Sequence, residues 1–114
     1  MTDEDKKQSI RDYFAFCAMG DALVRQSVEA FKEYSRKAGR DWLILYVIGD
    51  HGWHLGDMGI WGKATNFELS TRAPLIVSAP QAKAKGHKTD ALVEFVDVYP
   101  TLCELAGVPI PEHV

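Results

Sequence analysis

The sequence has few cysteines, no excess of basic residues and no long apolar run, and each shortage excludes a class of protein. Its two cysteines, Cys17 and Cys103, show neither metal-binding spacing nor a disulfide framework. Thirteen lysines and arginines stand against sixteen acidic residues without forming a basic stripe, so we expect no nucleic-acid partner. The longest apolar run, residues 42–48, is too short to span a bilayer, so we expect no membrane segment.

The first nine residues are polar and acidic, and they lack the apolar stretch of a signal peptide. The sequence therefore assigns no cellular compartment. What it does have is the composition of a globular domain: 114 residues, 46% hydrophobic and 25% charged, with a net charge of −3. That length is enough for one ordinary domain.

Local patterns predict an α/β protein. Apolar residues at helical spacing predict a helix over residues 9–38, with a possible break at Gly20, after which Asp21 caps a second helix. Gly39 is well placed to end it. The unbroken apolar run at 42–48 predicts a strand buried on both faces, as in a parallel sheet, and we expect it to run parallel to its neighbour.

The second half of the chain is also predicted to contain both strand and helix. Residues 74–79 predict another strand, and the polar, basic residues 80–90 predict an exposed loop. A short helix follows, with Asp97 as its cap, Pro100 in its first turn and Gly107 as its stop.

The segment at residues 49–63 is unusual for a connector. It holds five of the nine glycines, two of the three tryptophans and two of the four histidines. It also follows directly after a predicted buried strand. In open α/β sheets ligands bind beyond the carboxyl ends of strands, so this position favours a site over a linker.

Asp50 and His51 offer a carboxylate oxygen and an imidazole nitrogen side by side. Oxygen ligands suit Ca²⁺ or Mg²⁺, whereas an imidazole shifts the preference towards Mn²⁺ or Zn²⁺. The alternative is that Asp50 caps a turn and His51 is only hydrogen-bonded. Two ligands do not make a metal site, so the residues alone leave both interpretations open.

Three further side chains in this segment are candidates. His51 and His54 form a possible zinc pair, although the chain has no convincing third and fourth ligand. Trp53 and His54 are candidates for lining a substrate pocket, with packing as the alternative for the tryptophan. Lys63, held by a glycine-rich loop, suits an anionic oxygen, and a solvated surface lysine is the alternative.

Residues 47–80 as a whole resemble the sulfatases of the alkaline phosphatase superfamily, most closely the iduronate-2-sulfatase-like and choline-sulfatase-like branches. The corresponding family segment reads approximately S-D-H-G-W-x-L-G-E-H-G-x-W-x-K, followed by R-x-P-L-I-V. The match continues at residues 92–111, which resemble the family's V-D-L-x-P-T-L-L-D-L-A-G-L helix, and at residues 11–24. The resemblance covers nearly the whole chain.

The resemblance implies roles for individual residues. Asp50 and His51 match two metal ligands, and Lys63 matches the lysine that contacts the sulfate group. The implied cofactor is a divalent cation, Ca²⁺ first, with Mn²⁺, Mg²⁺ and Zn²⁺ as alternatives. Asp57 stands where the family usually has Glu, and Met58 where it usually has His, which leaves substrate preference in doubt.

One family element has no counterpart in the sequence. Sulfatases carry their nucleophile in a C-x-P-S-R or S-x-P-x-R motif, and neither Cys17 nor Cys103 lies in such a motif. We therefore interpret residues 1–114 as a C-terminal portion of a sulfatase catalytic domain, an α/β/α sandwich with a largely parallel sheet.

The function that this interpretation implies is metal-assisted hydrolysis of a small-molecule or carbohydrate sulfate ester in the complete enzyme. The isolated chain is expected to be inactive, because no attacking group is present. Two alternatives stay open: a phosphoesterase or phosphonate hydrolase of the same superfamily, and a non-catalytic truncated module.

Overall fold

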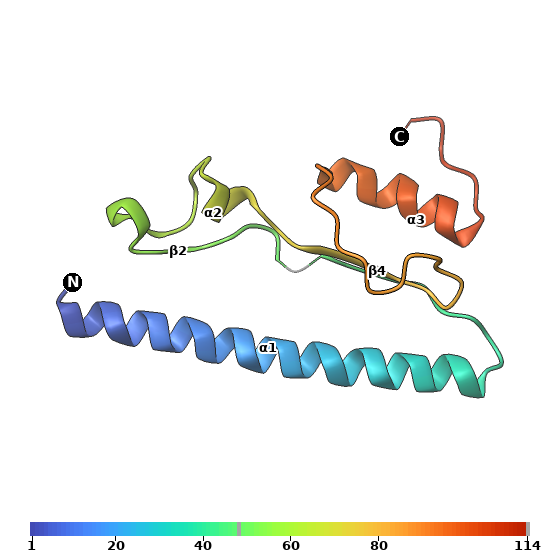
Figure 1. The fold of residues 1–114 in the computed structure, drawn as a ribbon, viewed down its shortest axis with the longest axis horizontal. Helices are drawn as coiled ribbons and strands as arrows, with labels where there is room; N and C mark the ends of the chain where they lie inside the picture. Colours follow the sequence, from blue (N-terminus) through green and yellow to red (C-terminus); the bar gives the residue numbers. More distant parts are fainter. Residues whose placement is uncertain (48, 114) are drawn as a thin grey trace. The chain divides into compact units, whose positions relative to one another are not determined.

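The computed structural model describes residues 1–47 and 49–113 (Figure 1). The chain divides into two compact units, and each is described by itself. The first unit combines Met1–Arg40 with Val47–Pro74, and the second combines Asp41–Tyr46 with the chain from Leu75 onward. In the described part of the chain, no helix is long and apolar enough to cross a membrane.

The first unit begins with a single long helix, α1 (Asp3–Lys37). The predicted break at Gly20 is wrong, because α1 continues through this residue. Space is not limiting at Gly20, since a Cβ built there meets no atom within 4 Å. The predicted end is confirmed: Gly39 adopts a left-handed φ of 61° and its N–H donates to the Arg36 carbonyl.

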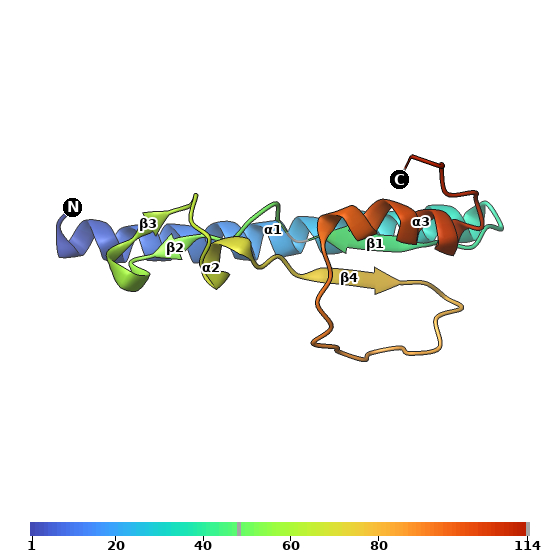
Figure 2. The same cartoon turned by 90° about the horizontal axis from the view of Figure 1, so that it is seen from above.

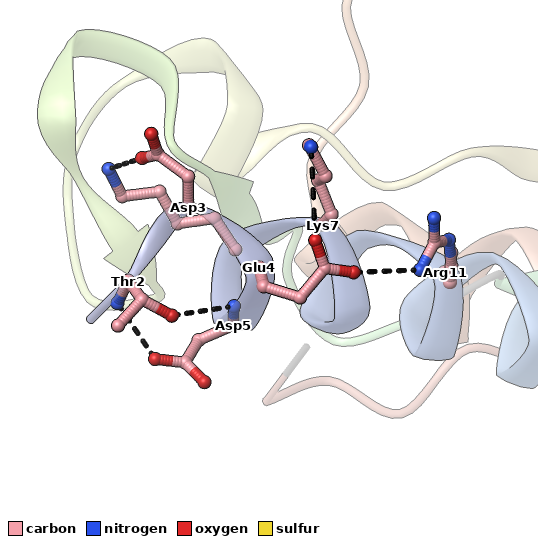
Figure 3. A network of polar contacts seen from close by, with 7 residues as sticks. Thr2, Asp3, Glu4, Asp5, Lys7 and Arg11 are labelled. Carbon is pink, nitrogen blue, oxygen red and sulfur yellow. Dashed lines mark hydrogen bonds and ion pairs between the residues drawn. The ribbon is translucent and has the colours of Figure 1, made fainter.

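A capping box begins α1 six residues earlier than the apolar spacing predicts. The Asp5 N–H donates to Thr2 Oγ1 at 3.2 Å, and the Thr2 N–H donates to Asp5 Oδ2 at 2.7 Å (Figure 3). Glu4 pairs with Lys7 and Arg11 in the next turns. The polar start of the sequence is therefore a solvated helical turn.

The rest of the first unit is a short hairpin and a helical turn. Strands β2 (His54–Leu55) and β3 (Trp61–Gly62) pair antiparallel, with His54 opposite Gly62 and Leu55 opposite Trp61 (Figure 2). The 3₁₀ turn η1 (Asp57–Gly59) joins them, and α2 (Glu68–Thr71) follows. The periodicity of the sequence predicts none of these short elements, since each is too short to show a pattern.

The second unit contains strands β1 (Ile44–Val47, whose last residue belongs to the first unit) and β4 (Leu75–Ser78), which form a two-stranded sheet. Both strands lie within the predicted ranges; residue 48, the last of the predicted first strand, is outside the described residues. Their arrows point in opposite directions in Figure 2, so the expectation that β1 runs parallel to its neighbour is wrong for this pair. Burial of β1 on both faces is not observed either, because all four of its residues are only partly buried.

The second unit ends with the 3₁₀ turn η2 (Phe95–Asp97) and helix α3 (Val98–Ala106). Gly107 ends α3 with a φ of 67°, as predicted. Asp97 occupies the N-cap position but does not cap α3 with its side chain; its Oδ2 accepts the Glu94 N–H at 2.7 Å instead. Residues 80–90 contain no helix or strand, in agreement with the predicted loop.

Candidate functional site

His51 lies in the segment that follows β1, and its two ring nitrogens have different partners. Nδ1 is 2.8 Å from the backbone oxygen of Gly52. A carbonyl oxygen only accepts, so Nδ1 carries the proton and donates. In the neutral ring this leaves the lone pair on Nε2, which lies 3.1 Å from Lys63 Nζ. The backbone of the neighbouring residue therefore selects the His51 tautomer.

Lys63 reaches His51 across twelve positions of sequence because the hairpin folds back on itself. In the register of β2 and β3, His54 lies opposite Gly62. Continuing this register by one residue places Trp53 opposite Lys63, just beyond the strand ends. Positive φ angles at Gly62 and Ala64 bend the backbone on both sides of Lys63. The ammonium group is thereby brought back to the segment that carries His51.

Asp50 completes a small cluster of polar atoms. Its Oδ2 lies 3.2 Å from Nε2 of His51, and its side chain is 83% exposed. A carboxylate oxygen and an imidazole lone pair repel each other unless a cation, or a proton on Nε2, lies between them. The cluster thus combines two cation-binding atoms with one anion-binding group.

A backbone hydrogen bond holds the segment that carries His51 against α2. The Gly52 N–H donates to the Ser70 carbonyl at 2.8 Å. The approach is so close that a Cβ on Gly52 would lie 1.8 Å from the Leu69 carbonyl oxygen. Only glycine fits this position, because any other residue brings a Cβ into contact with backbone atoms that have no room to move.

The structure separates the two residues that were expected to line a substrate pocket. Trp53 is 41% exposed and lines a cavity of ≈ 450 Å³. His54 is completely buried, with its Nε2 2.8 Å from Thr65 Oγ1 and its ring edge-on to Phe67. The expectation that His54 contacts substrate is corrected on this ground, because strand alternation points it to the opposite face of the hairpin from Trp53.

Thr65 and Ser70 are the residues that the sequence analysis missed. The Thr65 hydroxyl lies between His54 Nε2 and Ser70 Oγ, and Ser70 is 3% exposed. No signal in the sequence marks either residue, since their spacing to His54 has no meaning until the hairpin has formed. The zinc pair of His51 with His54 is also not observed, because Nε2 of His54 is bonded to Thr65 and the ring is buried.

Asp50 and His51 suit a divalent cation in their chemistry but supply only part of a coordination shell. Oδ2 and Nε2 are 3.2 Å apart, close enough for one ion to contact both. Among the residues that the structure describes, no group of three or more His, Cys, Asp or Glu side chains is arranged to hold a metal. A cation at this point needs further ligands.

With this geometry in view, comparison with known proteins identifies the family. The sequence profile of the sulfatase family matches residues 1–108. The chain belongs to the sulfatase family. Sulfatases have an α/β fold of the alkaline-phosphatase type and generally use a divalent cation, which agrees with the mixture of helices and strands observed.

Individual relatives carry sulfatase names. The chain is 32% identical to iduronate 2-sulfatase of Mus musculus and 33% identical to choline-sulfatase of Rhizobium meliloti, over 95% and 98% of its length. It is 36% identical to a sulfatase of Formosa agariphila over 90% of its length. These alignments cover only 24%, 21% and 19% of the relatives. The chain thus spans about a fifth to a quarter of the curated relatives it matches, and no solved structure matches it significantly.

Proposed function

We propose that the chain is part of a sulfatase catalytic domain and supplies the residues that bind a sulfate group and one side of a divalent cation. The observation that carries this proposal is the distance of 3.1 Å between Lys63 Nζ and His51 Nε2, with Asp50 beside them. Family membership supports it, because sulfatases act on anions of this kind. The reaction we propose is hydrolysis of a sulfate ester.

Lys63 is the proposed sulfate-binding and catalytic residue. Its ammonium is a compact charge that donates to an anionic oxygen, and it stabilises the negative charge that develops as the ester bond breaks. Asp50 and His51 are the proposed metal ligands, through Oδ2 and Nε2, with Ca²⁺ as the first candidate and Mn²⁺, Mg²⁺ or Zn²⁺ as alternatives. Held by these two residues, such a cation would supply charge withdrawal from the sulfate oxygens.

The substrate we propose is a small-molecule or carbohydrate sulfate ester. Trp53 is the residue we assign to contact the part of the substrate beyond the sulfate. It is exposed, it lines the cavity, and it lies opposite Lys63 in the hairpin register. An aromatic ring at such a place offers a large apolar face at little cost in conformational entropy.

We also propose that residues 1–114 belong to an α/β/α sandwich with a largely parallel sheet. Support comes from the sulfatase match and from β1, which leads directly into the segment with Asp50 and His51. Ligand sites of open α/β sheets lie at such strand ends. The antiparallel pair β1–β4 is compatible with this architecture, since mixed sheets often carry an antiparallel strand.

A chimera tests the proposed function. Residues 1–108 replace the matching segment of the Rhizobium meliloti choline-sulfatase, and kcat and KM for choline sulfate are measured after folding is checked by circular dichroism. The chimera is expected to be active, and Lys63→Met is expected to lower kcat by about 10²- to 10³-fold, because one charged donor to the reacting group is lost. Asp50→Ala is expected to remove most activity as well.

Lys83→Met provides the matched control, because Lys83 is exposed in the loop at residues 80–90. It should leave kcat unchanged. A folded, active chimera whose kcat is insensitive to Lys63→Met would overturn the assigned role. A folded chimera without activity would indicate a non-catalytic module instead.

A further inference from the structure

Three hydrogen-bonded side chains lie next to the candidate site, two of them buried and the third, Thr65, partly buried. His54 Nε2 is 2.8 Å from Thr65 Oγ1, and Thr65 Oγ1 is 2.9 Å from Ser70 Oγ. His54 is fully buried and Ser70 is 3% exposed. Buried hydrogen bonds of this kind hold a fixed geometry, because breaking one leaves a polar atom without water to replace the partner.

The hydrogen bonds hold the His54 ring in one orientation. Thr65 has one hydroxyl proton, so its hydroxyl donates to one of its two neighbours in the network and accepts from the other. His54 Nε2 is engaged by Thr65 in either arrangement, whereas Nδ1 has no hydrogen-bond partner within the described part of the chain. In His51 the proton lies on Nδ1, because Nδ1 donates to a carbonyl oxygen.

The same three residues connect the two segments that carry the candidate site. Ser70 accepts the N–H of Gly52, the residue next to His51, through its backbone oxygen. Thr65 lies two residues after Lys63 in the chain. The network thus joins the segment with His51 to the segment with Lys63, although none of its members contacts either side chain by a hydrogen bond given in the structure.

We propose that His54, Thr65 and Ser70 are positioning residues that hold the His51 imidazole and the Lys63 ammonium at the separation needed to bind a sulfate group. This proposal deepens the proposed function and rests on it for the identity of the anion. The central residue is Thr65, because its hydroxyl uses its proton on one neighbour and its lone pair on another. Valine has nearly the same shape but can make neither bond.

The first experiment reads the tautomers. Long-range ¹H–¹⁵N NMR spectra of the ¹⁵N-labelled chain distinguish imidazole rings protonated on Nδ1 from rings protonated on Nε2. The expected spectrum shows His51 protonated on Nδ1 and His54 in one fixed tautomer. If His54 shows rapid exchange between both forms, as free imidazole does, then the network does not hold the ring and the proposal is overturned.

The second experiment compares Thr65→Val, Thr65→Ser and the control Thr71→Val in the same chain. Thr71 also carries a hydroxyl, but that hydroxyl donates to the Phe67 carbonyl outside the network. Two quantities are measured: the nuclear Overhauser contact between the His51 ring and the Lys63 side chain, and the dissociation constant for inorganic sulfate by chemical-shift titration.

Thr65→Val is expected to abolish the His51–Lys63 contact and to weaken sulfate binding about fivefold to tenfold, the equivalent of one hydrogen bond lost. Thr65→Ser, which restores the hydroxyl, should recover both quantities, and Thr71→Val should change neither. A purely structural threonine would lower stability in the valine variant while the folded molecules kept their contact and their sulfate affinity. That result overturns the proposal.

The two proposals fail in different ways. If the unaltered chain shows the His51–Lys63 contact but binds no sulfate, the anion site of the proposed function is wrong, and the contact in Thr65→Val still decides whether the network positions the pair. If sulfate binds equally to the unaltered chain and to Thr65→Val, the positioning role is wrong and the anion site stands.

Discussion

Single residues in the hairpin region act through backbone geometry as much as through their side chains. Gly52 has no φ that demands glycine; it is required because the Leu69 carbonyl lies where a Cβ would be. Gly20 is the opposite case, an α1 glycine with open space around it. A side chain at Gly52 would clash with the backbone, whereas a side chain at Gly20 would not. Substituting each glycine by alanine should therefore have opposite effects on stability.

Gly52→Ala is expected to destabilise the chain by about 1–3 kcal/mol, because the added methyl group forces the Gly52 and Leu69 backbones apart. Gly20→Ala is expected to stabilise it by about 0.5–1 kcal/mol, because alanine loses less backbone entropy than glycine in a helix. Urea unfolding monitored by circular dichroism measures both. Equal effects of the two substitutions would show that the close approach at Gly52 is not present in solution.

At the scale of elements, α1 depends on its ends. The capping box at Thr2 and Asp5 satisfies two of the N–H groups that the first turn leaves free, and three acidic residues occupy that turn. Hydrogen bonds from the Thr2 side chain and then from its backbone N–H lower the pKa of Asp5 below its ordinary value of 3.8. The ionised carboxylate is therefore the form that stabilises the helix start.

This lowered pKa predicts that the start of α1 loosens on acidification, below the ordinary carboxyl pKa. The Asp5 carboxyl has a lower pKa in the folded chain than in the unfolded chain. It therefore stabilises the folded chain when the pH is above the pKa of the unfolded chain. This stabilisation is lost as the pH falls through the pKa of the folded chain. Carboxyl titration by NMR should give Asp5 a midpoint below 3.8, with weaker protection of the Asp5 amide, relative to its intrinsic exchange rate, once the carboxyl is protonated. Thr2→Val should move the midpoint back upwards. An unchanged midpoint in this variant would contradict the capping box.

The pKa of Tyr13, which lies two turns further along α1, is shifted in the other direction. Partial burial raises the pKa of its phenol, and the neighbouring Cys17 raises it further. Tyr13 therefore stays protonated throughout the range in which Asp5 titrates.

At the scale of the whole molecule, apolar side chains are poorly covered. Ala79 and Cys103 are the buried apolar residues of the described chain, whereas Leu92 is fully exposed and Val96 is 73% exposed. Apolar surface of this extent favours association with other surfaces. The chain spans about a fifth to a quarter of the length of the sulfatase relatives.

We expect the isolated chain to self-associate at high concentration and to bind a dye such as anilinonaphthalene sulfonate. The double variant Leu92→Glu with Val96→Glu should weaken association about tenfold or more, because two large apolar side chains are removed from the exposed surface. Gln81→Glu with Ala84→Glu adds the same charge in the loop at residues 80–90 and serves as the control. Sedimentation velocity measures the self-association of each variant. If both double variants associate equally strongly, the assignment of the association to Leu92 and Val96 is wrong.

The sequence by itself determined the elements and the candidate residues that depend on local chemistry. Gly39 and Gly107 end their helices where predicted, because a left-handed φ is a property of single residues. Strands β1 and β4 lie where the sequence predicts strands, because a run of β-forming residues is itself a strand signal. Asp50, His51 and Lys63 stand out because their spacing matches a family motif, so they could be named before any geometry was known.

Only the tertiary structure decided how these parts meet. The hydrogen bond from His54 to Thr65 spans eleven positions, and the contact of Lys63 with His51 spans twelve. Both depend on the register of a hairpin with two-residue strands, which local propensity cannot specify. The antiparallel direction of β4 has the same origin, because apolar composition gives a strand but not its direction. Long-range hydrogen bonds therefore fixed the position of the His54 ring and the geometry around Lys63.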